Sequence, residues 1–179
     1  LVDADTQRTA ATFTELRTDQ LGTPGYTAVS LDGAAIRTQV RQLAPKYQDI
    51  VIDAGGRDTA SLRAALTVSE VLLIPMQPRS FDLWAIEQMA ELVNEAREIN
   101  PDLRALLVIN AADSQGTDNQ DAAEVLQETP GMEVLPLKIG RRKAFPNAAA
   151  NGRAVIEQGR DKDPKAVKEL LALVESVYE

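Results

Sequence analysis

The hydrophobic positions of the chain fall into short apolar runs that alternate with longer amphipathic stretches. Several runs, such as EVLLIPM at 70–76 and ALLVINA at 105–111, are apolar at nearly every position. Continuous apolar runs are typical of strands that are covered on both faces. The pattern predicts strands at residues 1–2, 26–31, 49–53, 70–76, 105–111 and 133–137.

Helices are predicted between these strands, near 7–19, 33–44, 58–68, 82–99, 118–129 and 164–178. The clearest is 82–99, whose apolar residues recur on one helical face, namely Leu83, Ile86, Met89, Ala90 and Val93. Repeated strand–helix alternation predicts one α/β domain over residues 1–179. We expect a doubly wound, mainly parallel sheet with helices on both faces.

The composition excludes several kinds of active site. The chain of 179 residues contains no cysteine and no histidine. Disulfides, Ser-His-Asp triads and Cys- or His-ligated metals are therefore excluded. The absence of cysteine fits a reducing cytoplasm, and no apolar run approaches the roughly 20 residues of a membrane span.

The net charge of −8 is unevenly distributed along the chain. Residues 1–137 carry 10 basic and 21 acidic side chains, whereas residues 138–168 carry 9 basic and 3 acidic ones. A basic segment thus lies within an acidic protein. It is either a solvated surface or an anion-binding patch.

Polar residues follow several of the predicted strands. Asp3 and Asp5 follow the first, Asp53 closes the third, and Asn110 and Pro136 lie at the ends of two later ones. Ligands of parallel sheets bind beyond the carboxyl ends of the strands. Carboxylates without soft ligands favour Mg²⁺, held through waters and by a phosphate. This edge therefore favours phosphoryl transfer, in which positioning and charge stabilisation supply most of the catalysis.

Four segments, in order, resemble the ParA/MinD family of deviant-Walker P-loop ATPases, and its ParA-type partition ATPases most closely. LVDADTQ is similar to the family's Asp-x-Asp-Pro-Gln motif, with Thr6 in place of proline, and YQDIVIDAGG is similar to its Walker B strand. LLIPMQPRSFDLWAIEQM and IGRRKAFPNAAANGRAVIEQ resemble later segments of the family. The resemblance covers nearly the whole chain and implies a P-loop NTPase-like fold.

The family's Lys-Gly-Gly-x-Gly-Lys-Thr loop does not occur in this sequence. Either the sequence omits the first strand–loop–helix unit, which the missing initiator methionine favours, or the protein has lost it. That loop supplies the backbone amides and lysines that hold phosphates. We therefore expect residues 1–179 alone to be N-terminally incomplete and inactive in ATP hydrolysis.

The resemblance implies ATP and Mg²⁺ as cofactors. Asp3 and Asp53 would hold Mg²⁺ through water, and Asp5 would be the catalytic residue that orients or deprotonates the attacking water. Each aspartate also has a structural interpretation. The Asp-Ala-Asp segment would equally cap the helix near 7–19, and a carboxylate that closes an apolar strand needs a partner when it is buried.

The remaining nucleotide-binding residues are also implied by the resemblance. Gly55 and Gly56 would form a switch loop near the γ-phosphate, and Asn110 would pair with the adenine edge beside Pro136. The glycines alternatively permit a tight turn, and Asn110 alternatively closes one.

ParA-type dimers bind nonspecific DNA through late basic residues, in a salt-sensitive way that the phosphate backbone dominates. The corresponding residues here are Lys138, Arg141, Arg142, Lys143 and Arg153. A solvated surface is nearly as good an interpretation of this segment.

The leading hypothesis is a cytoplasmic, nucleoid-associated ATPase for plasmid, genomic-island or chromosome partitioning. Its ATP-bound homodimer would bind nonspecific DNA, and a ParB-like centromere-binding partner would stimulate hydrolysis. The alternatives are a non-hydrolysing interaction module of the same fold and a MinD-like membrane-associated ATPase. The C-terminal segment KELLALVESVYE argues against membrane association, because it is acidic where anionic lipid would lie.

Overall fold

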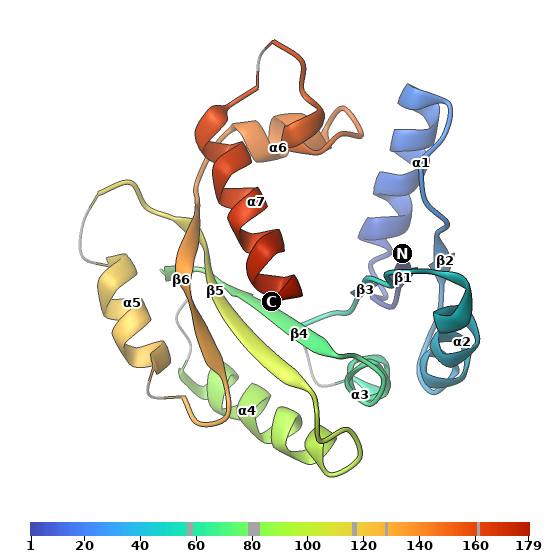
Figure 1. Ribbon diagram of the computed structural model, residues 1–179, viewed down its shortest axis with the longest axis vertical. Coiled ribbons are helices and arrows are strands. Elements are labelled where there is room, and N and C mark those ends of the chain that lie inside the picture. Colours follow the sequence, from blue (N-terminus) through green and yellow to red (C-terminus); the bar gives the residue numbers. More distant parts are fainter. Residues whose placement is uncertain (57–58, 79–82, 116–117, 128, 161) are drawn as a thin grey trace.

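The computed structural model describes residues 1–56, 59–78, 83–115, 118–127, 129–160 and 162–179. The strands, which Figure 1 shows, are β1 (Val2–Asp3), β2 (Val29–Ser30), β3 (Ile52–Asp53), β4 (Val71–Met76), β5 (Arg104–Ala112) and β6 (Glu133–Gly140). The α-helices are α1 (Thr9–Leu21), α2 (Ala35–Leu43), α3 (Ala60–Leu66), α4 (Leu83–Arg97), α5 (Asp118–Gln127), α6 (Ala144–Ala149) and α7 (Pro164–Tyr178). Two 3₁₀ turns, η1 (Ala44–Lys46) and η3 (Val155–Glu157), complete the described elements.

Each predicted strand and helix has a counterpart in the structure, with ends that shift by a few residues. The predicted helix starts at 58 and 82, and the motif residues 79–82, lie outside the described residues. Helix α6 was not predicted, because AFPNAA contains a proline and is short enough to be a turn. The proline is the third residue of α6, within the first helical turn, where an N–H group has no intrahelical partner to lose.

The strands form two three-stranded sheets, in the orders β2-β1-β3 and β4-β5-β6 (Figure 1). Every strand pair in the described residues is parallel. The predicted α/β fold with parallel strands is therefore confirmed. Strands β1 and β5 are the central strands of their sheets, so the residues that follow them lie between neighbours on both sides.

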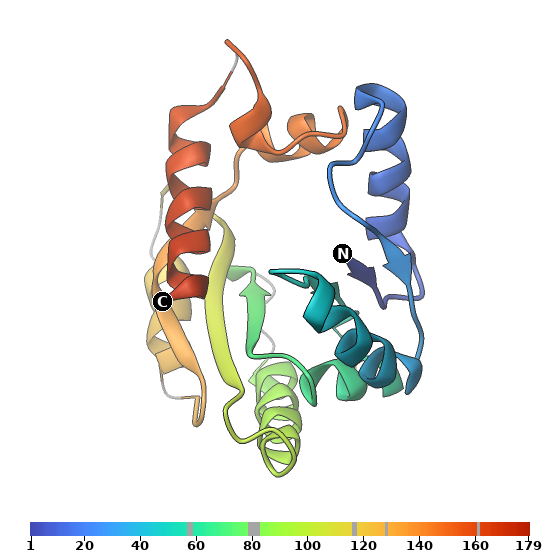
Figure 2. The same ribbon diagram turned by 45° about the vertical axis from the view of Figure 1, so that its right-hand side comes forward.

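The second sheet is covered on both faces (Figure 2). Leu107 of β5 packs in one cluster with Ile86 of α4 and Leu126 of α5. The adjacent residue, Leu106, packs in another cluster with Leu173 of α7. Successive strand residues face opposite sides, which explains why the run at 105–111 is apolar throughout. Each fully buried Leu of this kind stabilises the fold by about 1.5–3 kcal/mol.

The first sheet packs against α2 and α3. Val2 of β1 lies in one buried cluster with Ile36 and Val40 of α2 and Ala65 of α3. Helix α1, by contrast, contains no buried residue. Its position therefore depends on contacts at its two ends more than on an apolar face.

An apolar cluster between α3 and α4 joins the two halves of the molecule. Leu62 and Leu66 of α3 pack with Leu92 of α4 and with Leu103. The side-chain amide of Asn100 donates to the carbonyls of Leu66 and Ser69 at 2.9 and 2.7 Å.

Among the described helices, none is both long and apolar enough to cross a membrane.

A polar contact joins the halves a second time, where the segment after α6 reaches α1 (Figures 1 and 2). The Arg17 guanidinium of α1 donates to both carboxylate oxygens of Glu157, at 2.6 and 2.7 Å, and to the carbonyl of Gly152 at 2.7 Å. The hydrogen bond from Arg17 and that from the Ala154 amide lower the pKa of Glu157 to about 2. A bidentate arginine–carboxylate pair fixes orientation as well as distance.

Gly152 allows this approach because it has no side chain. Its φ is +61°, and a Cβ atom there would lie 2.7 Å from the Arg17 Cα. Gly22, at the end of α1, also has a positive φ of +80°, but a Cβ atom there would meet no atom within 4 Å. An alanine at either position would carry the cost of backbone strain, but only an alanine at position 152 would also overlap another part of the chain. Comparing the two substitutions therefore separates these costs.

We predict that Gly152→Ala lowers the free energy of unfolding by about 1–3 kcal/mol more than Gly22→Ala does, because it adds overlap with the α1 backbone to the shared strain. Urea unfolding of the two variants measures the difference. Equal losses would show that α1 does not press on Gly152 in solution.

Candidate functional site

Three carboxylates lie at the carboxyl edge of the first sheet. The parallel register of β1 and β3 pairs Asp3 with Asp53. Asp5 follows β1 by two residues, and its carboxylate Oδ2 lies 3.3 Å from where a Cβ atom on Gly55 would be. The structure therefore brings Asp3, Asp5, Asp53 and Gly55 together, as the rule for parallel sheets predicts.

Asp3 is buried, with 2% of its surface exposed. Its Oδ1 accepts a hydrogen bond from the Asp5 amide at 3.2 Å, and its Oδ2 accepts one from the Ala11 amide at 2.8 Å. Ala11 is the third residue of α1, so Asp3 satisfies one of the helix's unpaired N–H groups. The capping role considered for this segment is thus present.

Asp5 is oriented by its own turn. Its Oδ1 accepts hydrogen bonds from the Gln7 amide at 3.0 Å and from the Thr6 hydroxyl at 3.4 Å. Proline, the residue usual in the family at position 6, has no such hydroxyl. Within the described part of the chain, no group donates to Oδ2, the oxygen beside Gly55. That oxygen is available to bind water.

Asp53 is exposed, and its pKa is raised above the usual value. Desolvation by neighbouring atoms is the largest cause, and repulsion from Asp3 and then from Asp5 adds to it. The ionised carboxylates therefore repel one another across this edge. A cation placed among them would relieve that repulsion.

The described residues contain no group of three acids close enough to hold one metal ion directly. Mg²⁺ commonly keeps several of its waters and takes only one or two carboxylates, together with phosphate oxygens. A Mg²⁺ ion at this edge would therefore be held through its waters by one or two of the aspartates. The three aspartates do not fit a cage of direct carboxylate ligands.

Arg8 belongs to this site although the sequence did not indicate it. Its guanidinium donates to the Asp3 carbonyl at 2.8 Å and to Oδ2 of Asp32, after β2, at 2.6 Å. Its φ of 54° is left-handed, a conformation that costs a non-glycine residue about 1–2 kcal/mol. These two hydrogen bonds hold the turn between Asp5 and α1. The sequence carries no signal for them beyond a basic residue next to an acidic motif.

Asn110 and Pro136 lie on the second sheet, apart from the three aspartates. Asn110 Oδ1 accepts a hydrogen bond from the Ala111 amide at 2.9 Å, where Ala111 has a φ of 50°. Pro136 lies within β6, not at its end, because the strand continues to Gly140. The β5–β6 register shifts beside Pro136, which has no N–H to donate.

A Cβ atom on Gly56 would meet nothing within 4 Å, so that glycine faces open space.

The basic residues of the late segment differ in their surroundings. Arg142 donates to both carboxylate oxygens of Glu169 on α7, at 2.5 and 2.9 Å, and the Gly140 amide donates to the same carboxylate at 3.0 Å. Arg141 lies 3.8 Å from the Asp113 carboxylate. These two arginines are thus paired with acids, which reduces the positive charge they offer to a ligand.

The other three cations, Lys138, Lys143 and Arg153, are exposed. Lys138 lies in β6, Lys143 precedes α6, and Arg153 follows α6. Arg153 makes a long hydrogen bond of 3.4 Å to the Glu157 carbonyl. The predicted basic residues therefore extend from β6 to the segment before η3. Arg141 and Arg142 are paired with acids, and the other three contribute exposed positive charge.

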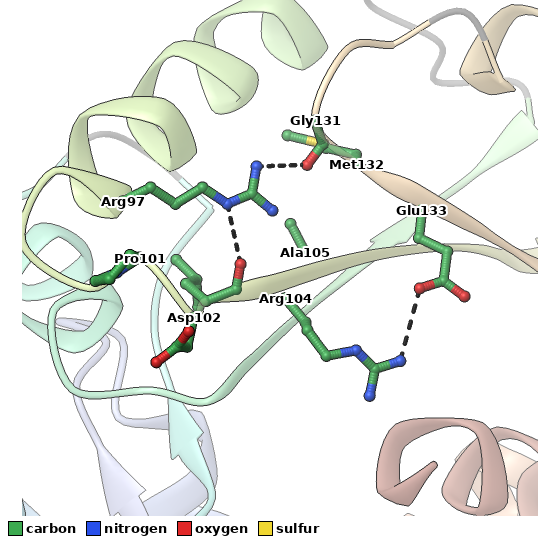
Figure 3. A pocket seen from close by; sticks show the side chains of 9 residues that line it. Arg97, Pro101, Asp102, Arg104, Ala105, Gly131, Met132 and Glu133 are labelled. Carbon is green, nitrogen blue, oxygen red and sulfur yellow. Dashed lines mark hydrogen bonds and ion pairs between the residues drawn. The ribbon is translucent and has the colours of Figure 1, made fainter.

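One surface pocket, of about 590 Å³, lies at the opposite edge of the second sheet, beside the amino ends of β5 and β6 (Figure 3). Arg97 donates there to the carbonyls of Leu103 and Gly131, and Arg104 lies 3.6 Å from the Glu133 carboxylate. Protein acceptors thus hold both guanidinium groups. Parallel sheets bind ligands at the other edge, so this pocket is not the candidate site.

The chain matches no protein-family model. It is 30% identical over 116 residues to the Maintenance of carboxysome distribution protein A of Halothiobacillus neapolitanus, which covers 64% of this chain and 53% of that protein. It is 23% identical over 88 residues to a ParA family protein of Mycoplasma pneumoniae, covering 49% of this chain and 33% of that protein. The chain thus spans about half the length of the first of these relatives and about a third of the second.

Two solved structures are similar in fold. A candidate plasmid partition protein of Borrelia burgdorferi B31, bound to AMPPNP, superposes with a TM-score of 0.62 at 18% identity, covering 98% of this chain and 86% of that one. A cobyrinic acid a,c-diamide synthase of Mycobacterium smegmatis, with a bound ATP analog and magnesium, gives a TM-score of 0.55 at 20% identity. That match covers 64% of this chain and 52% of the synthase.

We predict that Asp53→Asn raises the free energy of unfolding at pH 7 in the absence of ligand. A raised pKa means that the folded protein binds the Asp53 proton more tightly than the unfolded chain does. The stability that this group contributes is therefore present at low pH and is lost as pH rises from about 3.9 through the raised pKa. The gain from Asp53→Asn should disappear below about pH 3.

Urea unfolding at both pH values measures this gain. Asp19→Asn, on the exposed surface of α1, is the control and should change stability by less than about 0.5 kcal/mol. A variant Asp53→Asn that is less stable than the unaltered protein at pH 7 would show that the carboxylates do not repel one another.

Proposed function

The chain resembles the ParA/MinD family of P-loop ATPases in both sequence and fold, and on that premise we propose that the protein carrying it is a ParA-type partition ATPase. The observation that supports this most is the convergence of Asp3, Asp5 and Asp53 at one sheet edge. They lie in the two motifs that resemble those of the family. Residues 1–179 would form a single ParA-like domain.

ATP and Mg²⁺ are the proposed cofactors, since the similar structures hold an ATP analog with magnesium or AMPPNP. Mg²⁺, when bound, would neutralise charge that develops on the phosphates. Asp3 and Asp53 would hold its waters. Burial and two amide hydrogen bonds keep Asp3 in place, whereas exposed Asp53 is accessible to solvent.

Asp5 would orient the attacking water or accept its proton. The hydrogen bonds to Oδ1 fix the direction of the carboxylate, and Oδ2 remains to accept from water. A base must lie within hydrogen-bond reach of the proton it takes. Gly55 and Gly56 would let the backbone approach the terminal phosphate, and Asn110 and Pro136 would contact the base.

Partition activity would further require an ATP-dependent homodimer, nonspecific DNA binding through the basic segment, and a ParB-like partner that stimulates hydrolysis. The positive charge of residues 138–168 supports the DNA-binding part. The protein would then be nucleoid-associated in the cytoplasm. A protein assembly is a second candidate cargo, which the similarity to the carboxysome distribution protein favours.

We predict that Asp5→Asn lowers ATP turnover by about 10²–10⁴-fold while Mg²⁺–ATP binding is retained, because the amide keeps the turn's acceptor but is a poor base. Phosphate release by the intact protein, with Mg²⁺ and any partner it needs, measures turnover, and equilibrium binding of a fluorescent ATP analogue measures affinity. Glu15→Gln, an exposed change on α1, is the control.

Unchanged turnover in Asp5→Asn would remove Asp5 from the chemical step. Failure of the unaltered protein to bind or hydrolyse ATP would overturn the ATPase assignment itself.

A further inference from the structure

A polar pocket of about 630 Å³ lies between the C-terminal end of α1 and the α6–η3 segment. Its polar lining consists of four side-chain amides and one guanidinium, from Gln20, Asn147, Asn151, Gln158 and Arg153. Among the described residues of the lining there is no carboxylate and no aromatic ring. The pocket therefore offers hydrogen-bond donors and a single positive charge.

The acid nearest in sequence to Arg153 is already paired. Both oxygens of the Glu157 carboxylate accept hydrogen bonds from Arg17, and one also accepts from the Ala154 amide at 2.8 Å. The charge of Glu157 is thus compensated from the α1 side. Among the described residues, Arg153 donates one hydrogen bond, of 3.4 Å, to the Glu157 carbonyl, and its charge lowers the pKa of Glu157 less than the Arg17 charge does.

The walls of the pocket are fixed relative to each other. Gly152 lies so close to the α1 backbone that a Cβ atom would overlap it, and its carbonyl accepts a hydrogen bond from Arg17 at 2.7 Å. The Asn151 amide donates to the Asn147 carbonyl at 2.7 Å, which orients it on the end of α6. Gln20 on α1 and the amides of the late segment therefore form one surface, although they are distant in sequence.

The donor set matches a nucleic-acid backbone. Proteins contact phosphate and sugar oxygens with arginine, asparagine and glutamine side chains. Proteins that bind single strands also use aromatic rings on which bases stack, and no such ring occurs in the part of the lining that the structure describes. The observations therefore favour duplex over single-stranded nucleic acid.

The ion pairs of Arg141 and Arg142 also favour this pocket as the contact point. Arg142 forms an ion pair with Glu169 of α7, and Arg141 lies beside the Asp113 carboxylate. We propose that the pocket formed by Gln20, Asn147, Asn151, Gln158 and Arg153 binds the phosphodiester backbone of duplex DNA. This rests on the DNA-binding role proposed above and assigns it to a surface that includes α1.

Gln20→Glu tests the α1 wall, because Gln20 lies far outside the basic segment. A carboxylate there would repel phosphate, so DNA affinity should fall at every salt concentration. The matched control is Gln42→Glu, which adds the same charge on the exposed surface of α2 and should have a smaller effect. The measurement is fluorescence anisotropy of a mixed-sequence duplex with the intact protein and Mg²⁺–ATP, after thermal melting has verified that each variant is folded.

Arg153→Gln tests the cation. It should reduce the slope of log affinity against log salt by about 0.9, the value for one lost phosphate contact on B-DNA. Arg141→Gln, which removes a guanidinium already beside Asp113, should reduce the slope less.

The proposal is overturned if Gln20→Glu and Gln42→Glu have equal effects, or if Arg141→Gln reduces the slope as much as Arg153→Gln. In either case DNA binding would remain but would use the wider basic surface. Absence of DNA binding by the unaltered protein would overturn the proposed DNA-binding role together with the pocket, whereas its ATP binding would still be measured separately.

Discussion

The buried carboxylate of Asp3 holds the candidate site together. Burying an ionised group is costly unless hydrogen bonds compensate it. Here the amides of Asp5 and Ala11 donate to its two oxygens, while Arg8 donates to its backbone carbonyl. One residue thus fixes the end of β1, the turn that carries Asp5 and the beginning of α1. Its register with Asp53 adds the third carboxylate.

Helix α1 connects this site with the late basic segment. It has 13 residues and none of them is buried, so its position depends on its ends. Asp3 binds its first turn, and Arg17 binds Gly152 and Glu157 near its last. The proposed nucleotide site and the proposed DNA pocket therefore lie at opposite ends of one helix.

The sequence predicted those features that depend on local pattern. Continuous apolar runs identified the strands, and the rule for parallel sheets brought Asp3, Asp5 and Asp53 to one edge. It did not predict contacts between distant residues. The Arg142–Glu169 pair and the approach of Gly152 to Arg17 depend on which segments become neighbours, which periodicity does not encode. The sequence predicted a strand at 133–137 with Pro136 at its end, whereas β6 continues to Gly140 and a register shift accommodates Pro136 within it.

The central claim is that the three aspartates form a Mg²⁺–nucleotide site, and replacing Mg²⁺ by paramagnetic Mn²⁺ tests it most directly. Mn²⁺ broadens the NMR signals of amides near it, so a titration of the intact protein with ATP and Mn²⁺ locates the ion. The site described here predicts that amides of residues 3–8 and 53–56 lose intensity first. Loss of intensity first at the opposite sheet edge, around residues 101–105 and 131–133, or no selective loss at all, would contradict it.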